Sequence, residues 1–481
     1  MIKSSSLRGA ACVTLVSAAL VMTACGGGGE GGGSTSVASS DTGPVTSPVA
    51  GAVTVPVTST DTGALVTPAS TVTVAQYQVL RNASVEGSAV APDASQQTAL
   101  RADDIALAVS DMRQQLVGDG NLVVLPPLNH ASLRALGAAA RGDSLAQLTA
   151  HFDLAPTPVA AAWQTGAVVS AGWVTQGFKL TKTFLAATDS SAGRLAGWSL
   201  AESGFADGSN YADASLNLAV SNTGVSLRRD AYTRLALLHS LSLSAAWSGA
   251  TAFDGIFERS VHDQFSVSLL RLTAGVTRIT GTDYVADLLA AGDLRLLSLR
   301  PTADSLTAFA AGRLAPAMAE AVQTLLVAGG GAAGEMLLPA GGLSLYTSVD
   351  AAINRAGATQ VFDEVFANLR GLDEAGGTYA VASAPPAHLS IAAGGLDLNA
   401  AHGLSFVFSP SNVNSSVSYG GVFSWVNFPF TGTICVVGTA PTWPVADLRS
   451  LFLVLLDRRG AVLALTAIQT PEGTAYVPIC V

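Results

Sequence analysis

Two continuous apolar runs near the C-terminus flank a short polar turn. The runs cover 451–456 and 461–468, and the turn is Asp457–Gly460. Apolar runs of this length, bounded by a turn that ends in glycine, are typical of strands buried on both faces. The pattern therefore predicts a buried β-hairpin close to the C-terminus.

A helical pattern opens the folded part of the chain. Ile105, Val109, Met112 and Leu116 recur at helical spacing, and Gly118 follows them. Apolar positions three and four residues apart form one face of a helix, and glycine commonly ends it. We expect compact structure to start near this helix.

The next residues continue the order of elements. A short apolar strand over 122–125 precedes two prolines, an apolar helix through Leu136, a break at 141–144, and a second helix in which Leu145, Leu148 and Phe152 align. By contrast, 390–446 has no helical period. Its glycines and small residues are typical of a long loop.

The order of these segments resembles that of the serpin family. ALGAAARGDSLAQLTAHFDL (135–154) is similar to the family's buried helix, glycine-rich break and amphipathic helix. Further matches in order and type cover 222–225, 234–254, 293–301 and 337–363, and the long loop lies before the C-terminal hairpin, as in serpins. Leu125 and Leu128 stand where the family has its shutter serines, and Pro385 stands near the expected shutter histidine.

The resemblance implies an α+β fold with a large, mostly antiparallel central sheet, two smaller sheets, a helical cluster, and an exposed reactive loop near the C-terminus. It also implies an inhibitor that a protease cleaves in this loop. The cut segment would then insert into the large sheet as an extra strand, which requires alternate side chains to be buried. The reactive-loop region is predicted at 394–446.

Within that loop, Gly394 or Gly395 matches the hinge glycine, and Leu396 to Ala401, including Ala400, forms the inserting run. Counting fourteen residues from Gly394, as the resemblance implies, puts the cut between Phe408 and Ser409, whereas counting from Gly395 puts it between Ser409 and Pro410. We prefer the first bond, because proline after a cut bond lacks an N–H and has a fixed backbone angle. Phe408 would suit a chymotrypsin-like protease.

The N-terminus resembles a bacterial lipoprotein signal. Lys3 and Arg8 precede an apolar stretch over 10–22, and Met22-Thr23-Ala24-Cys25 follows as a lipobox. By this resemblance, residues 1–24 are a signal peptide and Cys25 is the lipidated first residue of an exported protein held on a membrane. Residues 25–96, rich in Gly, Ser, Thr and Pro, predict a tether, and 97–481 predict the serpin-like domain.

Two cysteines remain beyond the signal and the lipidation site. Cys435 and Cys480 are an even pair in an exported protein, where disulfides persist, so we favour a bridge between them over two free thiols.

Composition excludes several other classes of function. The net charge is −10 and only 12% of residues are charged, so the chain lacks the basic patch that nucleic-acid binding requires. H-E-x-x-H, C-x-x-C and G-x-S-x-G do not occur, and we expect neither an enzyme nor a cofactor or metal site. His239, inside an apolar strand, is predicted to be buried, and His402 to be exposed to solvent.

Two functions follow. The first is a monomeric, membrane-anchored inhibitor that protects the cell envelope, facing the periplasm or the exterior. The alternative is a non-inhibitory surface protein with a serpin-like fold, which binds partners through the extended loop.

Overall fold

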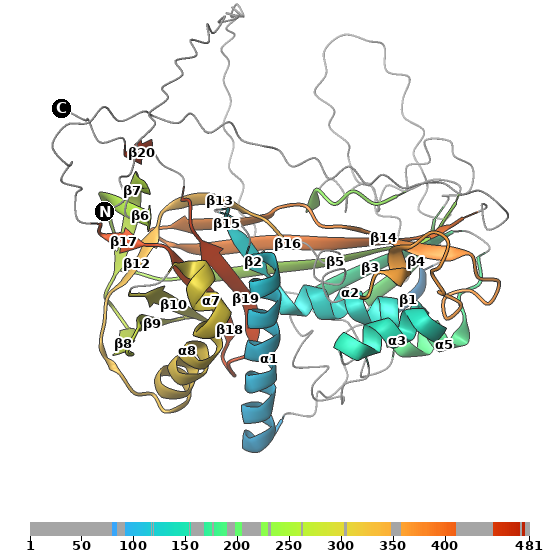
Figure 1. The fold of residues 1–481 in the computed structure, drawn as a ribbon, viewed down its shortest axis with the longest axis horizontal. Coiled ribbons are helices and arrows are strands. Elements are labelled where there is room, and N and C mark those ends of the chain that lie inside the picture. Colours follow the sequence, from blue (N-terminus) through green and yellow to red (C-terminus); the bar gives the residue numbers. More distant parts are fainter. Residues whose placement is uncertain are drawn as a thin grey trace, which may run out of the picture. The chain divides into compact units, whose positions relative to one another are not determined.

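The computed structural model describes 79–83, 92–154 without 117, 119 and 153, 168–175, 178–189, 198–203, 223–228, 232–347 without 261, 262, 303 and 304, 357–409, 446–471 and 474–476. The chain divides into two units, 1–59 and 60–481, and all described residues lie in the second. Three sheets and a set of helices make up this unit (Figure 1).

The largest sheet has eight strands, in the order β1-β4-β3-β5-β16-β15-β13, with β14 also paired to β16. All pairings are antiparallel except that of β3 with β4. The strands are β1 (Val79–Ala83), β3 (Val168–Thr175), β4 (Trp198–Ser203), β5 (Thr233–Ala246), β13 (Gly341–Leu345), β14 (Thr378–Ser383), β15 (Ala387–Ala392) and β16 (Gly395–Phe408). Strand β1 lies within the stretch that the sequence assigns to the tether.

A second sheet of seven strands contains the predicted C-terminal hairpin. Its order is β11-β8-β9-β10-β18-β19-β2, and every pairing is antiparallel. The strands are β2 (Leu122–Val124), β8 (Val276–Thr280), β9 (Tyr284–Ala291), β10 (Leu294–Pro301), β11 (Ala332–Ala333), β18 (Leu451–Asp457) and β19 (Val462–Ile468). All seven residues of β19 are buried, which confirms the hairpin predicted from its apolar runs.

The third sheet has five strands, in the order β12-β7-β6-β17, with β20 paired to β7. Strand β17 runs parallel to β6, and the other pairs are antiparallel. The strands are β6 (Thr251–Ser260), β7 (Asp263–Leu272), β12 (Met336–Pro339), β17 (Leu448–Arg449) and β20 (Thr474–Tyr476).

Helix α1 (Ala94–Gln115) begins at a side-chain cap. The Asp93 side chain accepts from the Gln96 N–H at 2.8 Å and the Gln96 side chain accepts from the Asp93 N–H at 2.9 Å, which is a capping box. Prolines occupy the first turn of α2, where no N–H is needed. The remaining helices are α2 (Pro126–Ala139), α3 (Gly142–His151), α5 (Lys182–Asp189), α7 (Leu306–Gly312), α8 (Leu314–Ala321), the π-helical turn η3 (Val322–Val327) and the 3-10 turn η4 (Gln360–Phe362).

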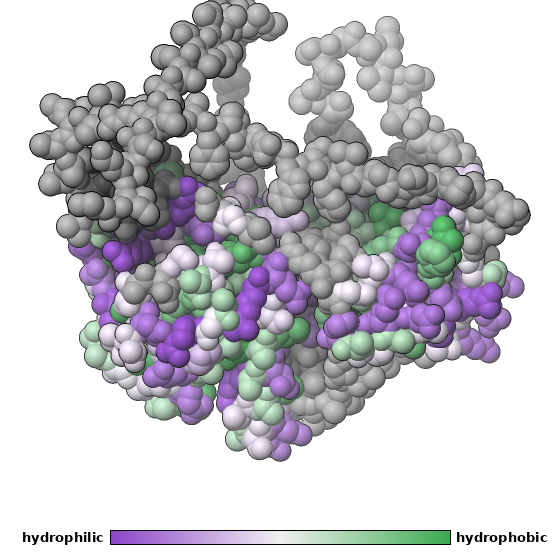
Figure 2. Space-filling view, viewed as in Figure 1, coloured by the Kyte–Doolittle hydropathy of each residue, from purple (hydrophilic) through white to green (hydrophobic). Residues whose placement is uncertain are grey.

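Two large apolar clusters and a third, smaller one fill the described part of the unit. Of the two large clusters, the first joins α2 to the large sheet, and the second joins α1, α7 and α8 to the seven-stranded sheet. Ile105, Val109, Met112 and Leu116 are all buried in the second cluster, which confirms the predicted helical face. On the outer face, hydrophilic residues are mixed with weakly hydrophobic ones (Figure 2), as the sparse charge of the sequence leads one to expect. Within the described residues, no helix combines the length and apolarity needed to cross a membrane.

One ion-pair network is buried in the seven-stranded sheet. The Asp287 carboxylate, fully buried, accepts from Arg278 Nε at 2.5 Å and from Arg300 Nη2 at 2.7 Å. Three adjacent strands contribute these residues, so the network joins β8, β9 and β10. Removing one member of a buried network leaves the others without a counter-charge.

We therefore expect Asp287→Ala to lower the free energy of unfolding by about 3–5 kcal/mol, measured by urea titration. Asp293→Ala is the matched control, because Asp293 pairs with Arg458 at the surface and its side chain is 82% exposed. That variant should unfold at nearly the wild-type urea concentration. Equal effects of the two substitutions would contradict the buried network's importance.

Candidate functional site

The candidate site is β16 and the elements that surround it. Along one edge, β16 pairs with β5 from Gly395↔Ala246 to Val407↔Thr233. Along the other edge it pairs first with β15 and then with β14, so it lies inside the large sheet (Figure 1). The sequence predicts an exposed loop from Gly394 onward, and the structure instead has a central strand over this part of it.

The side chains of the first half of β16 explain why this segment fits the sheet. Leu396 and Leu398 are 1% and 0% exposed and point into the core. Asp397 and Asn399 are exposed on the opposite face, where the side-chain oxygen Oδ1 of Asn399 accepts from Ser242 Oγ at 2.8 Å. Alternation of apolar and polar residues is the pattern of a strand with one buried face. The two leucines are therefore core anchors.

The two candidate hinge glycines differ in their surroundings. A side chain on Gly395 would meet the backbone carbonyl oxygen of Ala245 in the neighbouring strand, and backbone cannot easily yield. A side chain on Gly394 would meet open space, and the Gly394 carbonyl accepts from Trp247 N–H at 3.2 Å. Close approach of β5 thus requires glycine at Gly395.

From Ala400 to Val407 both faces of β16 are buried, because a short segment crosses the sheet there. We call this segment, 223–228, the strap. Its backbone N–H groups at Ser226 and Arg228 donate to Ser383 Oγ at 3.2 Å and to Ser405 Oγ at 2.9 Å. These two hydrogen bonds connect the strap to both β14 and β16.

The strap also contributes apolar contacts. Val225 and Leu227 form a small buried cluster with Trp173, Ala401 and three other residues of the sheet. Gly403 lies directly beneath them: a Cβ atom there would be 2.7 Å from Leu227 Cδ2 and closer still to Val225 Cγ1. Gly403 therefore provides the clearance that lets the strap lie directly over β16. The prediction of site residues from sequence missed Gly403, although glycine inside a strand pattern is a signal of close approach.

The far end of β16 holds the residues predicted to flank the cut. The Arg234 guanidinium lies over the Phe408 ring, 4.8 Å from its centre, and Phe408 N–H donates to the Tyr232 carbonyl at 2.8 Å. Ser409 N–H donates to the Gly377 carbonyl at 2.8 Å, and Ser409 Oγ donates to the Glu364 carboxylate at 2.6 Å. A cation over an aromatic face contributes about 0.5–2 kcal/mol, depending on desolvation.

A polar row crosses the core face of the sheet beneath α2. Ser170 Oγ lies 2.8 Å from His239 Nδ1, His239 is directly opposite His402 in register, and Thr347 Oγ1 lies 3.5 Å from His402 Nε2. Both histidines are 0% exposed. The prediction for His239 is confirmed, and that for His402 is wrong, because the surrounding strands and α2 bury this part of β16.

Burial determines the charge of both rings. It lowers the pKa of His239 to about 3, with a further lowering from His402, and it lowers the pKa of His402 to about 4 against an opposing hydrogen bond with the Leu128 backbone. Both rings are therefore neutral at pH 7. Leu125 and Leu128, where the family has serines, are fully buried, and the two histidines in this region come from β5 and β16 instead of the segment around Pro385.

Other predicted site residues lie outside the described residues. These are the lipidation site Cys25 and the predicted bridge of Cys435 with Cys480. Among the residues that the structure does describe, no group of three or more His, Cys, Asp or Glu is arranged to hold a metal ion.

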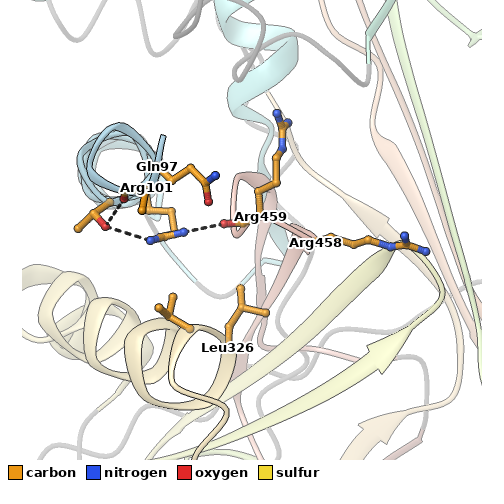
Figure 3. Close-up of a pocket in the computed structure, with 8 residues that line it drawn as sticks. Gln97, Arg101, Leu326, Arg458 and Arg459 are labelled. Carbon is orange, nitrogen blue, oxygen red and sulfur yellow. Dashed lines mark hydrogen bonds between the residues drawn. The ribbon is translucent and has the colours of Figure 1, made fainter. Parts of the chain in front are cut away.

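A pocket of about 300 Å³ lies between α1, η3 and the β18–β19 turn (Figure 3). Arg101 donates to the Arg459 carbonyl at 3.0 Å, while the side chains of Arg458 and Arg459 extend away from Arg101. Arg458 pairs with Asp293 and Arg459 with Asp457. Because these cations have partners and do not converge, the pocket does not form an anion site.

Comparison with solved structures identifies the fold. Cleaved Serpin 42Da superimposes with a TM-score of 0.55 at 13% identity, over 79% of this chain and 99% of that one. Tengpin, a thermophilic serpin in the latent state, gives 0.57 at 12% identity over 79% and 100%. A cleaved, loop-inserted ovalbumin mutant gives 0.56 at 13% identity over 78% and 100%. No protein family profile and no curated relative matches the sequence. The chain thus has the α+β serpin fold predicted from its sequence.

We expect Gly403→Val to disturb the inserted strand, since the new methyl groups must displace Val225 and Leu227. Overpacking of this kind costs about 1–3 kcal/mol in the free energy of unfolding, and amide exchange across 395–408 should rise. Both can be measured by urea titration and hydrogen–deuterium exchange.

Gly394→Ala is the matched control, because open space surrounds that position. It should leave exchange in 395–408 at the wild-type rate. Wild-type stability and exchange in Gly403→Val would refute the role assigned to the strap.

Proposed function

We propose that this protein inhibits serine-type proteases by cleavage of its reactive loop and insertion of the cut segment into the large sheet. The observation that supports the proposal most directly is β16, a strand of 14 residues that pairs with β5 over 395–407 on one edge and with β15 over 395–399 and β14 over 403–408 on the other. A sheet that accepts this segment provides the acceptor that such a mechanism requires.

In the proposed reaction, the chain provides the substrate segment and the protease provides the catalytic groups. The protease serine oxygen attacks the Phe408 carbonyl carbon, the peptide bond to Ser409 breaks, and the Ser409 amine leaves with a proton from the protease's general acid. Phe408 then remains attached to the protease as an ester. Insertion of 395–408 draws the attached protease along and distorts it before water can hydrolyse the ester.

The free energy for insertion comes from the side chains that β16 buries. Leu396, Leu398, Leu404 and Phe406 are each at most 1% exposed. Burying an apolar side chain of this size contributes about 1.5–3 kcal/mol. Hydrogen bonds from the strap and the contact of Arg234 with Phe408 add to this at the far end.

A chymotrypsin-like target follows from Phe408, since such proteases prefer a large apolar residue before the cut. We expect chymotrypsin and the wild-type protein to form an adduct that survives denaturing gel electrophoresis. Phe408→Gly should reduce adduct formation at least tenfold, because the preferred side chain is lost. Phe366→Gly is the control, since Phe366 is 67% exposed on a different segment.

Turnover of the loop without an adduct would rule out the inhibitory mechanism. Mass spectrometry of the released fragments would identify the cut bond and separate Phe408–Ser409 from Ser409–Pro410.

A second function has its own support. The uncut chain already holds β16 in the sheet, a state in which its segment is not free to meet a protease. A non-inhibitory binding protein with a serpin fold would need no exposed reactive strand. Cleavage by a non-target protease separates the two: a large rise in melting temperature means that the loop was outside and inserted, and an unchanged melting temperature favours the binding protein.

We further propose that the protein acts at the cell envelope, as a monomer attached through lipid on Cys25. The support is the apolar stretch before Cys25 and the tether composition after it. A tether of this kind would leave the folded unit room to meet a protease.

We expect Cys25→Ser to move the protein from the membrane fraction to the soluble fraction of an expressing bacterium, because the acyl chains are lost. Cys12→Ser changes only the apolar stretch that precedes the lipobox, so it should leave the protein in the membrane fraction. Immunoblots of the two fractions provide the measurement, and membrane retention of Cys25→Ser would exclude the lipid anchor.

A further inference from the structure

The polar row beneath α2 contains two histidines that face each other across neighbouring strands. His239 belongs to β5, which is part of the sheet on either side of insertion, and His402 belongs to β16, which is the inserting segment. Both rings are 0% exposed. Insertion therefore carries one titratable ring from solvent to a site directly opposite another.

The surroundings of the pair offer little to stabilise a positive charge. Toward His239, β3 presents the hydroxyl of Ser170, and His239 Nε2 finds no hydrogen-bond partner among the described residues. Toward His402, the partners are the Thr347 hydroxyl and the Leu128 backbone at the start of α2. Among the residues that the structure describes, no carboxylate contributes to the pKa of either ring.

Charged groups on the adjacent elements act elsewhere. On α2, burial lowers the pKa of His130, and the charge of Arg134 lowers it further. On β16, Asp397 is exposed on the opposite face of the sheet, and on β15, His388 is exposed. An imidazolium at position 402 would thus face another imidazole, two neutral partners and apolar side chains, which is unfavourable in a dry core.

We propose that insertion of β16 is coupled to release of a proton from His402, so that acidic conditions hold 395–408 out of the sheet and neutral conditions admit it. The proposal deepens the proposed function by adding a pH control to the same strand. The coupling itself belongs to the strand and the sheet, and it applies whether or not a protease is captured.

The direction of the pH effect follows from the linkage between proton binding by His402 and insertion of β16. Outside the sheet, His402 has an ordinary pKa of 6.5; inside, burial lowers the pKa to about 4. The inserted state therefore has its full stability above pH 6.5 and loses it as the pH falls toward 4, because the outside state binds the proton more tightly. At pH 5 these two values shift the equilibrium about 30-fold toward the outside state.

Hydrogen–deuterium exchange of the full-length protein tests this coupling. Exchange of peptides from 396–408 is compared at pH 7.5 and pH 5.0, after correction for the intrinsic chemical rate and in enough urea to bring opening into range. The wild type should show about a 30-fold larger opening constant at pH 5.0. Strand β18 in the same samples is the internal reference, and its opening should change far less.

His402→Gln should remove most of this pH dependence in 396–408, since the amide does not titrate. His388→Gln is the matched control, an exposed histidine on the adjacent strand, and it should keep the wild-type dependence. An opening constant in the wild type that is the same at both pH values would overturn the proposal, and so would an unchanged dependence in His402→Gln. The wild-type comparison requires no substitution and decides the matter even if the variant does not fold.

The chymotrypsin adduct assay tests the inhibitory function independently of the proton coupling. Loss of the adduct with a retained pH effect on β16 would remove the inhibitory function and keep the proton coupling. An adduct without a pH effect on β16 would support the inhibitory function and rule out the proton coupling.

Discussion

The structure depends on the acceptance of β16 between β5 and β15. This strand brings apolar side chains to the core face and receives the strap on the other face from Ala400 onward. In this structure β16 is the partner of β5 over 13 register pairs, and Leu404 and Phe406 fill the core face beneath α2. Hydrogen bonding and hydrophobic burial thus reinforce each other in the same segment.

The sequence predicted the parts of the fold in which local pattern and environment agree. The hairpin of β18 and β19 is apolar on both faces and buried on both, and the apolar face of α1 packs as its helical spacing requires. The order of segments along the chain also predicted the three sheets and the overall fold.

Prediction failed where burial depends on a distant part of the chain. Residues 395–408 contain glycines and alanines typical of a loop, and their position as a strand depends on pairing with β5 and β15, which come from other parts of the chain. The alternation of Leu396 and Leu398 with Asp397 and Asn399 was the available signal. His402 was predicted to be exposed because its sequence neighbours are small, yet α2, far away in sequence, helps to bury it. Gly403 has a role only because the strap lies above it, and no local pattern contains that contact.

The strap has a kinetic consequence beyond its contacts. Because the strap crosses β16 and bonds to both β16 and β14, the proposed movement of this half of β16 into or out of the sheet would require the strap to open first. Entry and exit of the strand would therefore have the same barrier, which is the opening of the strap. That opening would break up the buried apolar cluster of Val225 and Leu227. If the strand enters and leaves the sheet as proposed, the protein would show hysteresis: whether the strand is in or out would depend on the conditions under which the strap last opened.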